Sequence, residues 1–200
     1  MSNDVEDILG RFAEVARPEI LRDHIPNSCI ASTWITIEAL RRLGINAEPL
    51  EVRLTVGNAA YKRLVSEIGR PPQSEEELEE WSNQHGADVV GVGFDPPTPG
   101  NIGGHIVALA DGSHLVDASI DQVSNPATGI LPPGVHIGKV DPGFRWGRRP
   151  LQQLDTDDLY IQYLRTVVPT PWKKNYDWGS NPETESAVER IENLVSADVE

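Results

Sequence analysis

The chain has 200 residues, 38% of which are hydrophobic, and a formal net charge of −14 at pH 7. This length suits one domain with a substantial buried core, and the apolar fraction favours a folded chain over a disordered one. The negative charge argues against nucleic acid and anionic membrane surfaces as partners, because both would repel the protein.

The N-terminal part of the chain is predicted to form helices. Apolar residues at helical spacing predict a first helix over residues 5–16, which Pro18 should end or interrupt. Residues 28–43 are predicted to form the most buried helix, because apolar side chains occupy nearly all of its faces. Asn27 or Ser28 is the expected N-cap of this helix.

A strand and two short helices are predicted next. Gly44 is expected just after the end of the buried helix, where a glycine commonly takes a left-handed backbone. Alternating apolar and polar residues over 50–56 predict a strand with one solvated face. Residues 59–68 and 74–85 are predicted helices, and residues 87–94 are a predicted strand.

The remainder of the chain is predicted to be mainly β-structure. Prolines and glycines make residues 95–104 a loop, and residues 125–147 are too rich in both to be assigned. The other predicted elements are strands over 105–110, 114–120 and 159–168, an aromatic-rich loop over 169–179 and a helix that starts at 181. This order predicts one α+β domain over residues 1–200, with a core at about 20–168 and a C-terminal loop and helix at 169–197.

The only cysteine, Cys29, falls in the first turn of the predicted buried helix. The free N–H groups and partial positive charge of a helix N-terminus favour a thiolate, which is the nucleophilic form of cysteine. The chain has to bend at residues 26–28 to enter the helix, so the sulfur can be exposed there. A core thiol is the competing interpretation, because free cysteine is among the most buried residue types.

The chain has five histidines that could act on this thiol. His105 follows two glycines and opens an apolar strand, where glycines let a substrate or another segment approach closely. We expect His105 to be the base. His24, five residues before the cysteine, is the main alternative, whereas His114 is expected to be solvated beyond a hairpin turn.

Asp117 lies within the next apolar strand, where an unpaired charge would cost several kcal/mol. An imidazole on the neighbouring strand would be a suitable partner. Because side chains alternate between the faces of a strand, His105 and Asp117 share a face only if the hairpin loop has an odd number of residues. A three-residue loop over 111–113, with a type I turn and a following left-handed residue, meets that condition. Asp121 is the alternative carboxylate.

Three stretches of the chain follow one another in an order that is found in one enzyme superfamily. They are Cys29-Ile30-Ala31-Ser32, then Leu43-Gly44-Ile45-Asn46-Ala47 leading into a strand, and then Gly104-His105 and Val116-Asp117. In this order they resemble the transglutaminase-like branch of the papain-like cysteine enzymes, and arylamine N-acetyltransferases share the layout. The resemblance covers residues 27–121, about half of the chain. It implies a central buried helix packed on a mostly antiparallel sheet.

The resemblance also implies a cysteine-dependent acyl transfer. Cys29 would be the nucleophile, His105 the general base and then acid, and Asp117 the orienting group of a Cys–His–Asp triad. A peptide, amide or thioester substrate, which could be part of a protein, would give a thioester intermediate. Release to water would make the protein a peptidase or amidase, and release to an amine would make it a transglutaminase or another acyltransferase.

The oxyanion donors of such an enzyme are less well defined by the sequence. The papain pattern has a glutamine six positions before the nucleophile, where this chain has Asp23. The resemblance therefore leaves the backbone N–H of the nucleophile and one further donor, and the candidates for oxyanion or substrate contacts are Asn27, Ser28 and Gly104.

Two interpretations without chemistry remain open. The chain could be a binding or interaction module on the same scaffold, or a small structural protein whose cysteine belongs to the core. Histidines and carboxylates do not cluster with metal-ligand spacing, and no nucleotide-binding glycine pattern is present, so we expect no metal and no cofactor. With a single cysteine, no apolar stretch of bilayer length and an N-terminus unlike a secretory signal, we expect a cytoplasmic protein.

Overall fold

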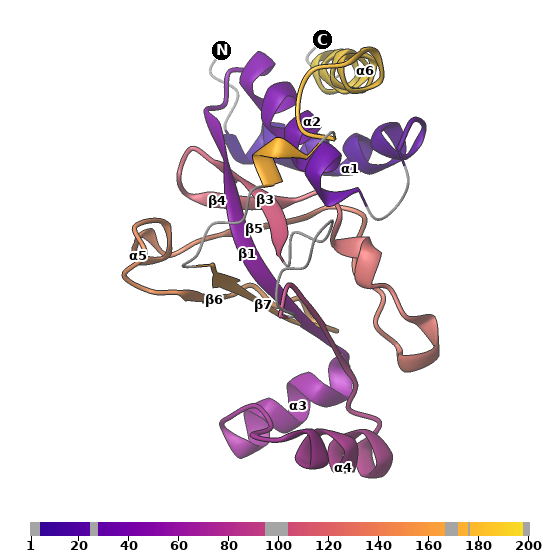
Figure 1. Cartoon of the computed structure of the whole chain (residues 1–200), viewed down its shortest axis with the longest axis vertical. Coiled ribbons are helices and arrows are strands. Elements are labelled where there is room, and N and C mark those ends of the chain that lie inside the picture. Colours follow the sequence, from indigo (N-terminus) through magenta and orange to yellow (C-terminus); the bar gives the residue numbers. More distant parts are fainter. Residues whose placement is uncertain (1–4, 25–27, 95–103, 167–171, 176, 198–200) are drawn as a thin grey trace.

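The computed structural model describes residues 5–24, 28–94, 104–166, 172–175 and 177–197. Within these ranges, helices pack on a curled sheet in which every strand pairing is antiparallel, and this confirms the α+β class (Figure 1). The helices are α1 (Val5–Leu21), α2 (Cys29–Arg42), α3 (Ala59–Ile68), α4 (Glu75–His85), α5 (Pro142–Arg145) and α6 (Pro182–Ala197), with 3-10 turns η1 (Ile120–Val123), η2 (Pro126–Thr128) and η3 (Trp172–Lys174). The strands are β1 (Ala47–Gly57), β2 (Val89–Val92), β3 (His105–Ala110), β4 (His114–Asp117), β5 (His136–Lys139), β6 (Leu151–Gln153) and β7 (Tyr160–Arg165).

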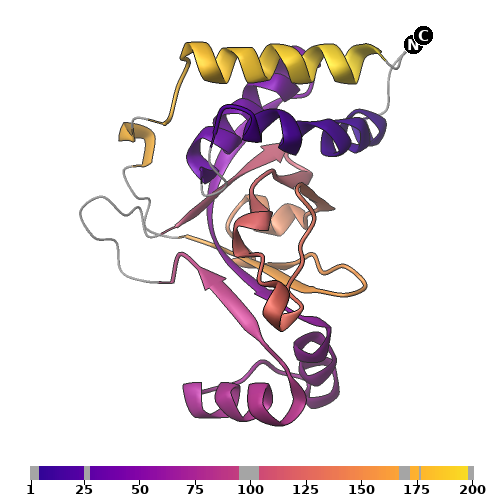
Figure 2. The same ribbon diagram turned by 90° about the vertical axis from the view of Figure 1, so that its right-hand side faces the viewer.

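Three helices cover one face of the sheet. Figures 1 and 2 show α1, α2 and α6 grouped together there, with α2 in contact with β1, β3 and both other helices. Thr33 of α2 donates a hydrogen bond to the backbone oxygen of Ile106 in β3 at 2.7 Å. The largest buried side chains of this layer are Leu9, Phe12, Ile20, Ile35 and Leu40. Burial of this apolar surface is the main term that holds α2 against the sheet.

The first helix continues past Pro18, which was expected to end or interrupt it. Proline removes one backbone hydrogen bond from a helix and crowds the preceding turn. Contacts from outside the helix hold its last turn in place: Arg17 forms an ion pair with Asp121, and Glu19 accepts a hydrogen bond from Arg190 of α6 at 2.8 Å. These long-range contacts outweigh the local preference.

The end of α2 agrees with the sequence prediction. Gly44 has a left-handed backbone with φ of +84°, its N–H donates to the Arg41 oxygen at 3.0 Å, and the Ile45 N–H donates to the Leu40 oxygen at 2.9 Å. This pair of hydrogen bonds is a Schellman motif, which satisfies the last carbonyl groups of a helix. The motif fixes the direction in which the chain leaves α2 and enters β1.

The sheet has the order β5-β4-β3-β1-β7-β6, and β2 pairs with the C-terminal half of β1. The predicted alternation along β1 is confirmed, because Leu50, Val52, Leu54 and Val56 are all buried in one cluster. This second core lies on the face of the sheet opposite the three helices, and the fully buried Tyr163 of β7 belongs to it. Both faces of β3 are therefore buried, whereas Glu51, Arg53 and Thr55 on the other face of β1 are half-buried.

Several predicted boundaries differ from the structure. The predicted strand over 114–120 ends at Asp117 and is followed by η1, and the predicted strand over 87–94 is reduced to β2. Strands β5 and β6 fall in segments that the sequence did not assign as strands. In the aromatic-rich segment, the rings of Trp172 and Trp178 meet edge to face with centroids 4.6 Å apart. Within the described residues, no helix is long and apolar enough to cross a membrane.

Helices α3 and α4 form a separate unit that the chain builds between β1 and β2. Figures 1 and 2 show this pair at the end of the molecule away from α1, α2 and α6. Asn58 caps α3 by accepting the Tyr61 N–H at 2.9 Å, and Ser74 caps α4 by accepting the Glu77 N–H at 3.2 Å. The unit has its own small core of Tyr61, Leu64, Trp81, Ala87 and Tyr160.

Two glycine substitutions should change stability in opposite directions. An added methyl group meets no atom within 4 Å at either Gly44 or Gly10, but Gly44 has positive φ and Gly10 lies within α1. Gly44→Ala should therefore lower the free energy of unfolding by about 1–2 kcal/mol, and Gly10→Ala should raise it by about 0.5–1 kcal/mol. Urea unfolding of both variants measures these changes. A Gly44→Ala protein with an unchanged free energy of unfolding would contradict the importance of the Schellman motif.

Candidate active site

The β3–β4 hairpin brings His105 and Asp117 together. Ala110 pairs with His114, so the connecting loop has three residues, and the odd loop length places the two side chains on the same face as predicted. The Nε2 atom of His105 lies 2.7 Å from Oδ2 of Asp117, and both side chains are fully excluded from solvent. The sequence argument for the pairing of these two residues therefore holds in geometry.

The hairpin turn has a different backbone from the one expected. The left-handed conformation occurs at Asp111, with φ of +46°, and at Gly112, with φ of +64°, and not at the residue after a type I turn. Aspartate tolerates this conformation better than most residues. Its side chain also accepts a hydrogen bond from the Asn46 N–H at 3.1 Å, which ties the turn to the start of β1.

The carboxylate of Asp117 is surrounded by hydrogen-bond donors. Its Oδ1 atom accepts from the N–H of Ser119 at 3.1 Å and from the hydroxyl of the same residue at 3.3 Å. Its Oδ2 atom faces the His105 ring and accepts from the Tyr163 hydroxyl at 3.1 Å. Burial alone would raise the pKa of Asp117, but the His105 ring and the Ser119 N–H lower it below its usual value. The group is therefore held as a carboxylate.

The imidazole of His105 joins this carboxylate to the cysteine. Burial of the ring lowers the pKa of His105, whereas the Asp117 carboxylate and a hydrogen bond with the Cys29 thiol raise it, and the result is a pKa of about 10. Cys29 is half-buried at the start of α2. The structure therefore brings the three candidate catalytic residues together, with the histidine as the link.

Gln122 is a further neighbour of the histidine that sequence reasoning missed. Its Nε2 atom lies 2.8 Å from Nδ1 of His105. The residue belongs to η1, so it reaches the ring only because the chain leaves the sheet after Asp117 and turns back. A polar residue five positions after the candidate carboxylate was a signal in the sequence, but the predicted strand gave no reason to direct it at the ring.

Asp121 does not serve as the orienting carboxylate. It forms a two-point ion pair with Arg17 of α1, with Nε–Oδ2 at 2.9 Å and Nη2–Oδ1 at 2.6 Å. The Arg17 side chain is buried, and its Nη1 atom lies 3.4 Å from the Ser32 hydroxyl of α2. A hydrogen bond and an ion-pair contact from one guanidinium to the two carboxylate oxygens fix both partners in orientation. This ion pair therefore anchors η1, and Gln122 with it, to the helical layer.

Of the three candidates for oxyanion or substrate contacts, the structure describes two. Asn27 and most of the loop that precedes His105, up to residue 103, lie outside the described residues. Ser28 occupies the N-cap position of α2 without a side-chain capping hydrogen bond. Gly104 lies against the side chain of Glu51, whose Oε1 atom would be 3.0 Å from an added Cβ. A larger residue at this position would therefore require the Glu51 side chain to shift.

The alternative histidines occupy different positions. His24 follows the end of α1, and its Nε2 atom has no hydrogen-bond partner among the described residues. His114 was expected in solvent but is buried at the start of β4, where its Nδ1 atom lies 3.0 Å from the Ser113 hydroxyl. The prediction for His114 was wrong because the strand pairs on both sides, with β3 and β5.

His136 of β5 is a neighbour of Asp117 that lies on the adjacent strand. It is the cross-strand partner of Asp117, and its ring stacks on Tyr163 with centroids 6.2 Å apart. Burial lowers the pKa of His136, although the Asp117 carboxylate opposes this. A neutral ring is therefore favoured at this position. The sequence did not place His136 because its segment was not assigned to a strand.

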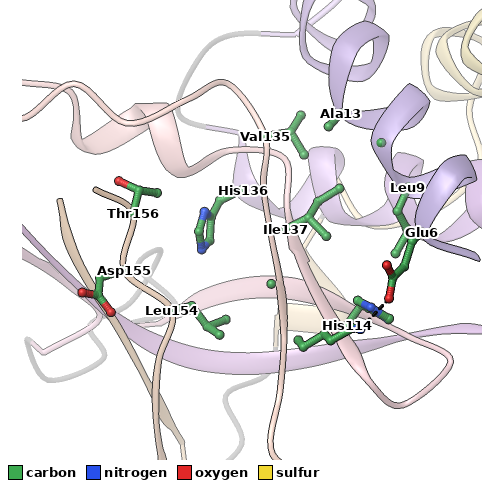
Figure 3. A pocket seen from close by; sticks show the side chains of 13 residues that line it. Glu6, Leu9, Ala13, His114, Val135, His136, Ile137, Leu154, Asp155 and Thr156 are labelled. Atoms are coloured by element: carbon green, nitrogen blue, oxygen red, sulfur yellow. Dashed lines mark ion pairs between the residues drawn. The ribbon is translucent and has the colours of Figure 1, made fainter. Parts of the chain in front are cut away.

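A pocket of about 610 Å³ lies along β5, between α1 and residues 154–156 (Figure 3). Figure 3 shows His136 and His114 at two separate places on its wall. Cys29, His105 and Asp117 are not among its described lining residues, so it is distinct from the space beside the thiol. Among the residues that the structure describes, no group of three or more His, Cys, Asp or Glu side chains could hold a metal ion.

No protein-family model matches this chain, and comparison with curated proteins and with solved structures gives no significant match. The chemical interpretation of the site consequently depends on the geometry described above.

The free energy of unfolding should depend on pH through the His105–Asp117 pair. Because the folded pKa of His105 is raised from 6.5 to about 10, its stabilising contribution is complete below pH 6.5 and is lost as the pH rises through about 10. In a Cys29→Ser background, which removes the titrating thiol but leaves the Asp117 carboxylate that raises the pKa of His105, His105→Gln should cost most stability near pH 6 and progressively less as the pH rises above 6.5. Urea unfolding at several pH values measures this, and a cost independent of pH would contradict the ion pair.

The two neighbouring aspartates should respond differently to removal of their charge. Asp117→Asn removes the charge that holds the proton on His105, so the pKa of His105 should fall, and its amide leaves one donor of the site unpaired at a cost of about 1–3 kcal/mol. Asp121→Asn should cost about 3 kcal/mol or more, because it leaves the buried Arg17 without its carboxylate. Titration of the His105 ring by NMR distinguishes the two aspartates. If the pKa of His105 fell as far in the Asp121→Asn protein as in the Asp117→Asn protein, Asp117 would not be the carboxylate that is paired with the ring.

Proposed function

We propose that this protein is a cysteine-dependent acyl-transfer enzyme on a papain-like, transglutaminase-like scaffold. The observation that carries the proposal is the position of the His105 ring, which contacts the Cys29 thiol and the Asp117 carboxylate at once. A nucleophile, a base and a group that orients the base are the parts that such chemistry requires. They come from the start of α2, from β3 and from β4, in the order that the family resemblance implies.

Each of the three residues would have a defined role in the reaction. With its pKa raised to about 10, His105 would already carry the thiol proton at neutral pH, and the thiolate of Cys29 attacks the carbonyl carbon of the substrate to form a tetrahedral oxyanion. When this collapses, the imidazolium of His105 gives its proton to the leaving amine or thiol, and the acyl group remains on sulfur as a thioester. Water or an amine then attacks the thioester, loses its proton to the ring and releases the thiol.

Asp117 would set the orientation of the base. By accepting a hydrogen bond from Nε2, it leaves Nδ1 as the nitrogen that faces the sulfur. The Ser119 N–H, the Ser119 hydroxyl and the Tyr163 hydroxyl fix the carboxylate itself, so the imidazole has one favoured orientation. This arrangement supports a reactive thiol more than a packing one, since a core cysteine needs no such partner.

The proposed substrate is a peptide, an amide or a thioester. The helix N-terminus at Cys29 supplies backbone N–H groups for the oxyanion, with Ser28 and Gly104 as the described candidates for further contacts. Water as acyl acceptor would define a peptidase or amidase, and an amine would define a transferase.

An activated ester such as p-nitrophenyl acetate tests the proposal. The wild-type protein should release about one equivalent of p-nitrophenol in a burst and carry one acetyl group on Cys29, detectable by mass spectrometry and removed by hydroxylamine. His105→Gln should slow the burst on the order of a hundredfold or more, because the general base is lost. Adding a primary amine to the acetylated protein shows whether the thioester is released to water or to the amine.

Cys29→Ser is the control for this experiment. The variant should show no burst and no acetyl adduct, and its free energy of unfolding should change by less than about 1 kcal/mol, because the thiol is half-buried and the volume is nearly conserved. An acetyl group found on a lysine in both proteins, or a loss of about 2 kcal/mol or more in Cys29→Ser, would overturn the proposal in favour of a core cysteine.

A further inference from the structure

Two side chains meet at one nitrogen of the candidate base. Nε2 of His105 is occupied by Asp117, which leaves Nδ1 for the Cys29 thiol that is hydrogen-bonded to the ring. The amide of Gln122 lies 2.8 Å from that same Nδ1 atom. A ring nitrogen of histidine carries either one lone pair or one hydrogen, so it forms one strong hydrogen bond at a time. Gln122 and Cys29 therefore compete for it.

We propose that Gln122 is a gate on the reactivity of Cys29: its amide competes with the sulfur for Nδ1 of His105 in the resting site, and the ring pairs fully with the sulfur only when the amide turns away. This inference rests on the proposed acyl-transfer function and adds regulation to the same site. Gln122 is a positioning residue here, because it acts through His105.

The gate works in both protonation states of the ring. When Nδ1 is bare, the amide N–H of Gln122 donates to its lone pair and withholds it from the thiol. When Nδ1 carries a proton, the amide oxygen of Gln122 accepts a hydrogen bond from it after a half-turn of the amide, because an amide has a donor on one side and an acceptor on the other. In either state the bond between the ring and the sulfur is weakened by the presence of the amide.

The surroundings of Gln122 fix its backbone and leave its amide able to exchange partners. The Arg17–Asp121 ion pair holds η1 on one side, and Ser119 bonds to Asp117 on the other. Gln122 itself is only half-buried. A substrate carbonyl beside the thiol offers the amide N–H a new acceptor, so that substrate binding releases Nδ1. The thiol would then become nucleophilic when a substrate is present and remain protected otherwise.

Other charged and titratable groups near the ring come from several elements. They are Asp117 of β4, His136 of β5, Tyr163 of β7 and the ion pair between Arg17 of α1 and Asp121 of η1. A change confined to the side chain at 122 leaves all of them in place. A shift in thiol reactivity after such a change therefore reports the gate.

Alkylation of the single cysteine by iodoacetamide across a range of pH tests the gate without a substrate. Gln122→Met keeps the length of the side chain and removes its amide, so the thiolate should form at lower pH. The midpoint of the alkylation profile should fall by about half a unit to one unit, which is about a three- to tenfold faster reaction below the midpoint. Gln84→Met, on an exposed face of α4, is the matched control and should leave the profile unchanged.

The outcomes separate the gate from the function on which it rests. His105→Gln should slow alkylation at neutral pH, because the ring no longer stabilises the thiolate, and no change there would overturn the Cys29–His105 pair and the proposed function together. If His105→Gln has that effect but Gln122→Met leaves the midpoint unchanged or raises it, the gate alone is wrong. In the double variant, Gln122→Met should have no effect, because the gate acts through the ring. Gln122→Ala must shift the midpoint in the same direction, which covers the case in which Gln122→Met folds poorly.

Discussion

An ionised carboxylate that is fully removed from water needs hydrogen-bond donors on every side, and the structure around Asp117 is arranged to supply them. The donors come from three places: His105 on β3, Ser119 just after β4 and Tyr163 on β7. Strand β7 is three positions away from β4 in the sheet, so Tyr163 reaches the Asp117 carboxylate because the sheet is curled. The hairpin register, the end of β4 and the curl of the sheet are thus coupled through one buried group.

The candidate nucleophile and its base belong to different layers of the molecule. Cys29 is placed by α2, whose position depends on the apolar core shared with α1 and α6, whereas His105 is placed by the sheet. Few polar contacts join the layers near the site; they include the Thr33 hydrogen bond to β3 and the Arg17–Asp121 ion pair. Apolar packing therefore sets the approach of sulfur to imidazole. A cavity in the helical core would change this approach even though none of the three candidate residues is altered.

Features that depend on short stretches of sequence were predictable. The left-handed glycine at 44, the alternation along β1 and the parity of the hairpin that pairs His105 with Asp117 all follow from local rules. Features that depend on distant partners were not. The helix through Pro18 is held by residues about a hundred or more positions away, and Gln122 meets the ring because a turn replaces the predicted end of a strand. The assignment of a catalytic role to Cys29, His105 and Asp117 is a proposal that their arrangement supports.

The α3–α4 unit has a different relation to the rest of the chain. Its small core is closed by Tyr61, Leu64, Trp81 and Ala87, and Tyr160 of β7 is the core member that the sheet contributes. A unit with its own core can open without disturbing the strands that carry the histidine and the carboxylate. Its backbone amides should then exchange with solvent deuterium through a local opening of lower free energy than that of β3 and β4. The protein can in this way tolerate substitutions in α3 and α4 while the site keeps its geometry.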